Sequence, residues 1–166
     1  MVDLGLPSGL LWCDCNLGAN IETDYGDYFA WGETKPKNIY TYDTQLYREN
    51  TIKISGKDDA ATQCLGEYFR LPSYEDCVEL IDNTSSKWVE NYNGTNTNGM
   101  LFIGKNGNSI FIPAAGYRVE TDTSLKNNTA YLWTNDLYIS FPQDAYAMCF
   151  SKINTLHMDY ENRSFG

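Results

Sequence analysis

The residues able to carry out catalysis or to bind a metal are few and scattered along the sequence. The chain has one histidine, His157, and no C-x-x-C pair, so the short ligand spacings of Cys and His metal sites are missing. The acidic pair Asp58 and Asp59 stands where a helix is expected to begin, a position at which solvated carboxylates favour the helix dipole. With no Gly-rich phosphate loop and no Ser/His/Asp arrangement, we expect no enzyme activity, no metal and no cofactor.

The chemistry of the cysteines is limited by their number and spacing. Five cysteines cannot all pair within one chain. Cys13 and Cys15 lie two residues apart on a predicted strand, where they share one face and are poorly placed to bond to each other. Cys64 and Cys77 can pair only if their Cα atoms lie within about 7 Å. The sequence therefore predicts five free thiols, most of them buried.

Polar and aromatic side chains gather in the last third of the chain, and they are the candidates for ligand contact. Loops on a rigid scaffold are where adaptable recognition is usually found. The neighbouring residues Ala145, Tyr146, Met148 and Phe150 are instead expected to pack in the core. The residues predicted to contact a ligand are Trp133, Thr134, Asp136, Tyr138, Ser140, Ala147, His157, Asp159, Tyr160, Asn162, Ser164 and Phe165.

The composition of the chain indicates which partners such residues can meet. With 22 acidic and 12 basic residues and a net charge of −10, the surface should repel phosphate backbones and anionic lipids. We therefore expect a protein or glycan ligand, no nucleic acid and no membrane insertion. The 13 Tyr, 7 Phe and 4 Trp favour recognition, because tyrosine offers a large contact area with a polar tip. No run reaches membrane-spanning length, and the N-terminus does not resemble a signal peptide.

The element expected at the centre of the fold is a β-hairpin. Residues 100–103 and 110–112 are apolar, partly β-branched runs, and Asn106-Gly107 between them suits a tight turn. Pro113 is expected to end the strand pairing. The small residues at 114–116 leave room for a neighbouring backbone or aromatic ring to approach closely.

Two helices are predicted to accompany the hairpin. The first spans about residues 58–65 and stops at Gly66. The second begins after Ser73, whose side chain can cap the free amides, with Asp76 three residues on as in a capping box. Its apolar positions, which recur at helical spacing and should face a sheet, are Cys77, Leu80 and Ile81.

The remaining segments divide into strands and loops. Strands are expected at residues 10–16, 131–133, 146–150 and 153–157. Residues 83–86 should end the second helix, and residues 20–47, 91–99 and 120–129 are expected to be loops, the first of them ordered by its aromatic residues. Since helices and strands do not alternate, the sequence predicts a single α+β domain with two helices packed on a twisted, mainly antiparallel sheet.

Motifs spread over nearly the whole chain resemble those of a known family. They are Val2-Asp3-Leu4-Gly5-Leu6-Pro7-Ser8-Gly9, Tyr25-Gly26-Asp27-Tyr28-Phe29-Ala30-Trp31-Gly32-Glu33, Asp58-Asp59-Ala60-Ala61, Phe69-Arg70-Leu71-Pro72-Ser73, Glu79-Leu80-Ile81 and residues 106–118. Together they resemble the fibrobacter-type major paralogous domain, which is common in surface proteins of gut Bacteroidales. The resemblance implies the formylglycine-generating-enzyme-like branch of the C-type lectin fold, and an extracellular location on a bacterial surface or a phage particle.

The same resemblance implies a function. Some relatives are variable proteins of diversity-generating retroelements, in which adenine-directed mutagenesis rewrites surface residues near the C-terminus. The chain is then a non-enzymatic, surface-displayed receptor or adhesin domain with a diversified C-terminal binding face. A template copy of the gene's 3′ end beside a reverse transcriptase, differing only at adenines, would support this hypothesis. The codons of Met148, Lys152, Met158 and Glu161 should then be unchanged.

Two departures from the family pattern also lead to expectations. Cys64 and Cys77 stand where such domains usually carry Trp, which affects the local packing rather than the fold. The family continues beyond Gly166 into one more strand, of Ser-Val-Arg type, which ordinarily pairs near the first strand. Without that partner, the strand at 10–16 should present an open hydrophobic edge, and such edges favour pairing with another chain. We therefore expect a homo-oligomer formed through this edge.

Three other functions are alternatives to ligand binding of this kind. The segment Trp133-Thr134-Asn135-Asp136 is similar to the Trp-Asn-Asp strand of calcium-dependent, sugar-binding C-type lectins, but its Thr shifts the phase by one residue and no Glu-Pro-Asn motif precedes it. The enzyme that gives the branch its name oxidises a cysteine with copper held by a cysteine pair, whereas the C-terminal half here has only Cys149. A structural or assembly module of a surface fibre, with aromatic residues in subunit contacts, is the third alternative.

Overall fold

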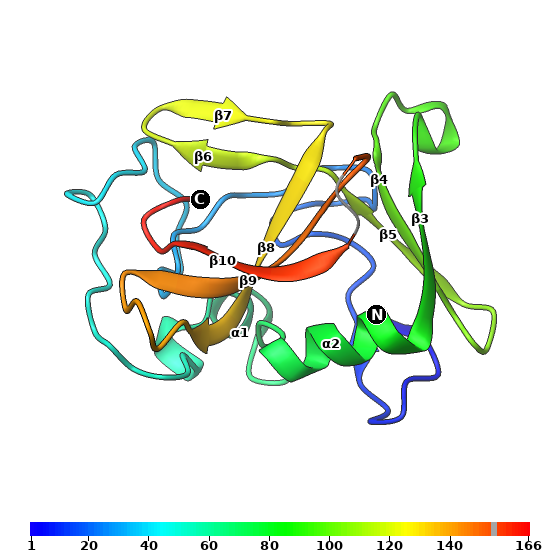
Figure 1. Ribbon diagram of the computed structural model, residues 1–166, viewed down its shortest axis with the longest axis horizontal. Helices are drawn as coiled ribbons and strands as arrows, with labels where there is room; N and C mark the ends of the chain where they lie inside the picture. Colours follow the sequence, from blue (N-terminus) through cyan, green and yellow to red (C-terminus); the bar gives the residue numbers. More distant parts are fainter. Residues whose placement is uncertain (154–155) are drawn as a thin grey trace.

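The computed structural model describes residues 1–153 and 156–166, which contain two helices and ten short strands joined by loops (Figure 1). The strands form four small antiparallel sheets. The predicted α+β class is therefore confirmed. The elements are β1 (Val2–Asp3), β2 (Leu11–Trp12), the 3-10 turn η1 (Gly56–Asp58), α1 (Ala60–Leu65), α2 (Tyr74–Asn83), β3 (Thr84–Val89), the 3-10 turn η2 (Tyr92–Gly94), β4 (Gly99–Gly104), β5 (Ser109–Pro113), β6 (Tyr117–Val119), β7 (Asp122–Ser124), β8 (Thr129–Leu137), β9 (Asp144–Ser151) and β10 (His157–Asn162).

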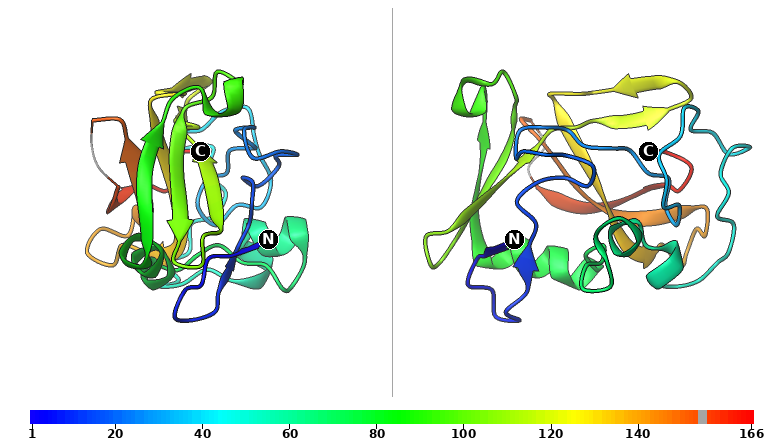
Figure 2. Two further views of the ribbon diagram at one scale, coloured as in Figure 1. Left: turned by 90° about the vertical axis from the view of Figure 1, so that its right-hand side faces the viewer. Right: turned by 180° about the vertical axis from the view of Figure 1, so that it is seen from behind.

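The β10-β9-β8 sheet occupies the middle of the molecule. Helix α2 runs below it and the β6–β7 hairpin lies above it in Figure 1. The β3-β4-β5 sheet stands at one end, and the left panel of Figure 2 shows it face-on with helix α2 at its foot. The long loops that precede α1 wrap the opposite end. The central sheet is thus covered in part on both faces.

The predicted hairpin forms, but it lies in the sheet at one end of the molecule rather than at the centre of the fold. Strands β4 and β5 pair antiparallel with Phe102 opposite Ile110, and Gly107 takes a positive φ of 87° in the turn between them. Both apolar side chains are buried and join Leu80 of helix α2 in the main core. Strand β5 ends at Pro113, as its missing amide hydrogen leads one to expect.

Helix α2 is capped as the sequence predicts. Ser73 Oγ accepts a hydrogen bond from the Asp76 amide (3.1 Å), and the Asp76 carboxylate accepts one from the Ser73 amide (2.6 Å). Burial acts to raise the pKa of Asp76, but hydrogen bonds from Arg70 and Ser73 lower it below its ordinary value. Cys77 and Leu80 are completely buried in the core that the helix shares with the central sheet.

Asp59 has a different role from the one expected. The sequence favours a solvated carboxylate at this position, but Asp59 is completely buried. Its side chain accepts hydrogen bonds from the amides of Thr62 (3.0 Å) and Leu71 (2.9 Å). Asp59 therefore caps α1 and ties that helix to the segment before α2, while Gly66 ends α1 as predicted.

Two polar strands were not predicted. Strand β3 follows helix α2 directly and pairs with β4, Trp88 opposite Met100, where the sequence predicts a helix end and polar residues. Strand β7 lies within the expected loop and pairs with β6, Ser124 opposite Tyr117. The side chains of both strands are mostly exposed or half-buried, so neither segment has a clear apolar alternation. Pairing with a neighbour, rather than local sequence, makes them strands.

The predicted first strand is much shorter than expected. Instead of residues 10–16, only Leu11 and Trp12 pair, with Asp3 and Val2. Cys13 and Cys15 lie outside the strand, in an irregular segment. A two-residue edge offers few free backbone groups to a second chain, so the long open edge expected here is not formed.

The late strands differ from the prediction in length and position. Strand β8 covers nine residues rather than three, and β9 begins and ends slightly outside its predicted range. Strand β10 begins at His157, the position where the predicted strand ends. Residues 154–155 of that prediction lie outside the described residues.

The small residues after β5 pack closely, as the sequence predicts. Ala114 is completely buried. Gly116 has a positive φ of 72°, and a Cβ placed on it would lie 2.0 Å from the carbonyl oxygen of Ser124. Only glycine fits this approach between the end of β5 and the β6–β7 hairpin.

Replacing Gly116 by alanine is expected to reduce the free energy of unfolding far more than the same change at Gly107. Positive φ costs a residue with a side chain about 1–2 kcal/mol at either position. A Cβ at Gly107 meets no atom within 4 Å, whereas one at Gly116 meets backbone. Gly116→Ala should therefore lose more than about 4 kcal/mol in total. Urea denaturation followed by tryptophan fluorescence measures both losses, and equal values would contradict the close approach.

Candidate ligand-binding site

The site is organised by a bulge in strand β8. Trp133 pairs with Ala147 and Leu137 with Ala145, so β8 advances four residues while β9 advances two. Within the bulge, the Thr134 hydroxyl donates a hydrogen bond to the carbonyl of Tyr146 (3.0 Å). The bulge moves the intervening residues out of the ladder and turns their polar groups toward other segments.

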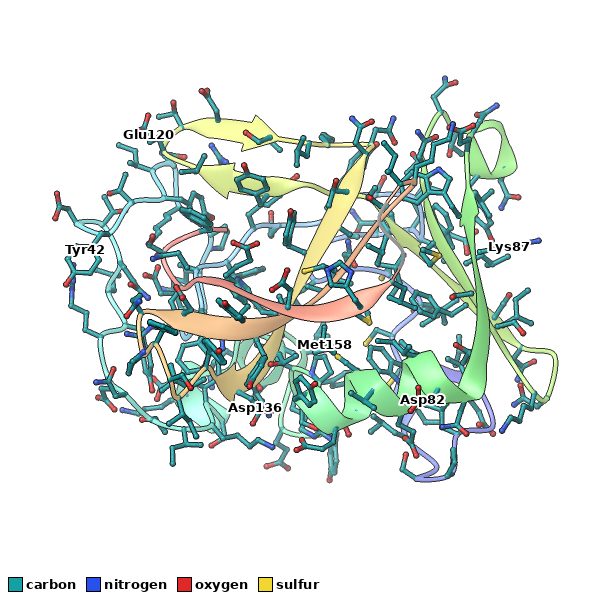
Figure 3. The ribbon with its side chains drawn as sticks, in the orientation of Figure 1. Tyr42, Asp82, Lys87, Glu120, Asp136 and Met158 are labelled. Atoms are coloured by element: carbon teal, nitrogen blue, oxygen red, sulfur yellow. The ribbon has the colours of Figure 1, made fainter. Side chains whose placement is uncertain are left out.

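Asn135 and Asp136 connect the bulge to the start of helix α2. The Asn135 amide donates to the carbonyl of Pro72 (2.8 Å), and the Asp136 carboxylate accepts from the amide of Tyr74 (2.7 Å). The same carboxylate lies 3.2 Å from Lys53 Nζ. Figure 3 shows Asp136 at the lower edge of the sheet, near helix α2. Asp136 therefore holds the first residue of the helix, and Tyr74 with it, against the sheet.

Five aromatic side chains meet beside this junction and form what we call the aromatic patch. Tyr138 stacks on Tyr160 with ring centroids 4.0 Å apart and planes inclined by 13°. It also stacks on Phe141 (5.9 Å) and meets Tyr146 edge-on (5.2 Å). Tyr146 in turn meets Tyr74 edge-on at 4.8 Å. The patch thus joins the start of α2, the end of β8, the turn before β9, β9 itself and β10.

The patch is partly open to solvent. Tyr160 is 42% exposed and Phe141 51% exposed, while the other three rings are half-buried. Burial raises the pKa of Tyr146, and the neighbouring Tyr138 raises that of Tyr160, so both phenols stay neutral around neutral pH. The patch therefore offers aromatic faces together with neutral hydroxyl groups.

A carboxylate flanks the rings. Asp144 and Tyr146 are alternate residues of β9 and share a face, on which Tyr160 of β10 lies directly opposite Tyr146. Asp144 is half-buried, and among the described residues its carboxylate has no hydrogen bond or ion pair. Burial raises the pKa of Asp144, whereas the positive charge of Arg163 acts to lower it. An acidic acceptor is therefore available at the edge of the patch.

Five of the predicted ligand contacts lie at the aromatic patch or beside it. Tyr138 and Tyr160 belong to the patch, and Asp136 anchors it. Asn162 lies opposite Asp144, and its side-chain oxygen accepts from the Ser164 hydroxyl (2.7 Å). Ser140 is exposed in the turn between β8 and β9, close in sequence to both Tyr138 and Phe141.

Three predicted contacts are buried, so the prediction is wrong for these residues. Thr134 and Ala147 are completely buried and Ser164 is 3% exposed. Thr134 forms a hydrogen bond within the bulge, and Ala147 lies in the middle strand of the sheet, covered by other segments of the protein. Their side chains leave no surface for a ligand to contact.

Three other predicted contacts, Trp133, His157 and Asp159, lie on the opposite face of the sheet, because side chains alternate along a strand. The fourth, Phe165, follows the end of β10. His157 and Asp159 line a small pocket of about 190 Å³, with 3.6 Å between their side chains. The Trp133 indole donates to the carbonyl of Phe29 (2.9 Å), and Phe165 stacks on Tyr117 (5.8 Å). These four residues are not brought to the aromatic patch.

Trp133 and Phe165 also line a groove of about 1150 Å³ that the sequence did not reveal. Its walls come from residues 10–19, residues 25–33, the segment around α1 and the central sheet. The indole nitrogen of Trp12, in this wall, is buried and has no hydrogen-bond partner among the described residues. The groove depends on how distant loops fold over the sheet, which no local pattern predicts.

Three members of the aromatic patch were missed as site residues. Tyr74 opens a helix, Phe141 lies in a turn, and Tyr146 was assigned to the core. The predicted strand at 146–150 stops short of Asp144, so no signal in the sequence indicated that Tyr146 shares a face with that carboxylate. The positions of Tyr74 and Phe141 depend on the packing of α2 and on the length of the β8–β9 turn.

The sequence also led to predictions about the thiols, metal binding and membrane insertion. All five cysteines carry free thiols, as predicted, but only Cys77 and Cys149 are buried, and burial strongly raises the pKa of both. In residues 1–153 and 156–166, no three His, Cys, Asp or Glu side chains are grouped as a metal site requires. In the same residues, no helix has the length and apolar character needed to cross a membrane.

The chain was also compared with known proteins. No protein-family model, no curated protein and no solved structure matches it.

Replacing Asp136 by alanine should loosen the start of helix α2. The change removes the acceptor of the Tyr74 amide and the partner of Lys53, and it should lower the free energy of unfolding by about 1–3 kcal/mol. Lys53→Met is the matched control, because the lysine side chain is 48% exposed and a pair of this kind contributes about 1 kcal/mol or less. Hydrogen exchange at the Tyr74 amide should be faster in Asp136→Ala but not in Lys53→Met. An unchanged Tyr74 amide would contradict the anchoring role.

Calcium is not expected to stabilise the chain through Asp136. Both oxygens of this carboxylate are engaged, by the Tyr74 amide and by Lys53. Melting temperatures in millimolar CaCl2 and in EDTA should therefore agree. A ligand present at a hundred times its dissociation constant stabilises by about 2.7 kcal/mol. A rise in melting temperature that corresponds to this stabilisation, and that disappears in Asp136→Ala, would instead favour a calcium-dependent lectin.

Proposed function

We propose that this chain is a non-enzymatic ligand-binding domain displayed outside the cell, and that the aromatic patch is the centre of its binding surface. The exposure of interlocked rings carries this proposal. Tyr160 and Phe141 present open faces, while Tyr138 between them is held by three ring contacts. Tyrosine at the centre of a contact surface commonly supplies most of the binding energy.

The rings are held in place without a ligand. Tyr146 and Tyr160 are fixed by strand pairing, and Tyr74 is fixed by its hydrogen bond to Asp136. Side chains that are ordered in advance lose little conformational entropy when a ligand binds. This rigidity supports recognition by a preformed surface.

The surroundings of the patch suit a binding surface. Ile139, which is 64% exposed, and Ser140 extend from the turn beside Phe141. Asp144 and Asn162 lie on the other side, at the paired ends of β9 and β10. An apolar centre with a polar rim is the usual composition of a protein interface.

The finer identity that we propose is a variable domain of C-type lectin fold on a bacterial surface or phage particle. The family motifs in the sequence support it, as does the depth of the side chains along β10. Met158, in the middle of the strand (Figure 3), packs on the main core, whereas Tyr160 reaches solvent. Exposed positions of this kind can change without disturbing the core, as diversification requires.

Ligands selected on the chain are expected to depend on the rings of the patch. Panning a phage-displayed random peptide library and probing a glycan array with the purified chain provide the ligands. Tyr160→Ala and Tyr138→Ala should each weaken binding by about tenfold or more, the loss typical of a central aromatic residue. Biolayer interferometry with the selected peptides or glycans gives the dissociation constants.

Tyr68→Ala is the matched control, since Tyr68 is 90% exposed and lies outside the patch. Its affinity should equal that of the native chain. Selected ligands whose binding is unaffected by Tyr160→Ala and Tyr138→Ala would overturn the assignment of the patch. Self-association that both substitutions abolish, with no selected ligand, would favour the assembly module instead.

A further inference from the structure

We infer that the aromatic patch binds an arginine side chain of a protein partner, with the guanidinium stacked on the exposed tyrosine face and paired with Asp144. The inference rests on the proposed function and names the chemistry of its ligand. It follows from the position of the groups at the edge of the patch and from their lack of partners among the described residues.

Asp144 lacks a counter-ion in the described structure. Among the described residues, its half-buried carboxylate forms no ion pair. Two cations beside the start of helix α2 are already engaged: Lys53 lies 3.2 Å from Asp136, and Arg70 is paired with Asp76. Arg163 is close enough to influence Asp144 but forms no ion pair with it. A cation from a partner would complete this site.

The rings favour a cation at the same place. The face of an aromatic ring attracts a guanidinium within about 6 Å of its centroid. This chain uses the same contact internally: Arg48 lies 4.5 Å from the Tyr42 ring, and Arg163 lies 5.5 Å from the Trp31 ring. Tyr160, on the same face of the sheet as Asp144, offers an exposed ring that no cation of the chain covers among the described contacts.

An anionic ligand is disfavoured. The first amides of helix α2, which could attract an anion, already donate to carboxylates: Ser73 to Asp76 and Tyr74 to Asp136. The net charge of −10 acts in the same direction at longer range. A basic partner is therefore attracted both by the surface as a whole and by the site.

Arginine suits the site better than lysine or a neutral sugar. Its planar guanidinium can stack on a ring and donate two parallel hydrogen bonds to one carboxylate, whereas an ammonium is a compact point charge. A sugar can stack on the rings but leaves Asp144 without a counter-ion. We therefore assign the partner to the class of proteins that present an exposed arginine.

An NMR titration of the isotope-labelled chain tests this assignment. The probes are a short glycine–serine peptide with one central arginine and its twin with citrulline, which has the same shape without the charge. The arginine peptide should bind about tenfold more tightly than its twin, with the largest shifts at the amides around Tyr160 and Asp144. Tyr160→Phe should retain binding, because the ring face remains. Asp144→Asn and Tyr160→Ala should each weaken it about tenfold.

Asp43→Asn is the matched control, since it removes one exposed carboxylate far from the patch in sequence and should leave the affinity unchanged. Equal affinity for both peptides, or equal losses in Asp144→Asn and Asp43→Asn, would overturn the arginine assignment. A glycan that binds in a Tyr160-dependent manner, together with equal peptide affinities, would refute arginine but retain the proposed function. If no ligand depends on Tyr160, both proposals fail.

Discussion

The bulge in strand β8 is the constraint on which the arrangement of the other segments depends. Thr134, Asn135 and Asp136 leave the regular ladder, and buried polar groups that leave a ladder must find other partners. Those partners are the indole of Trp31 and the backbones of Ile54, Pro72 and Tyr74. One short segment therefore ties two long loops and the start of helix α2 to the central sheet.

This constraint divides one face of the central sheet into two parts. Beneath helix α2, Met148 and Phe150 are buried with the helix residues in the main core. Beyond the first residue of the helix, the same strands carry Tyr146 and Tyr160 toward solvent. Tight packing under the helix fixes the backbone that presents the exposed rings, so stability and recognition are served by adjacent residues of the same strands.

The elements predicted correctly are those with local causes. The β4–β5 hairpin follows from apolar runs around a turn that needs glycine, and the start of α2 follows from a capping box between Ser73 and Asp76. The elements predicted wrongly depend on contacts with another segment rather than on a pattern of their own. Strands β3 and β7 are polar and form because a partner strand is present. Asp59 is buried, and Leu71, twelve residues further on, supplies a second amide to its carboxylate.

The sequence by itself determined the kinds of residue that reach the surface near the C-terminus, and it identified Tyr138 and Tyr160 among them. Tertiary structure decided which of these residues meet. The two additional residues in β8 set the register with β9, and register determines the face on which each side chain lies. Thr134 and Ala147 were buried by this pairing, while Tyr74 was added by a hydrogen bond to Asp136, 62 residues away. Contacts between residues so far apart leave no periodic trace in the sequence.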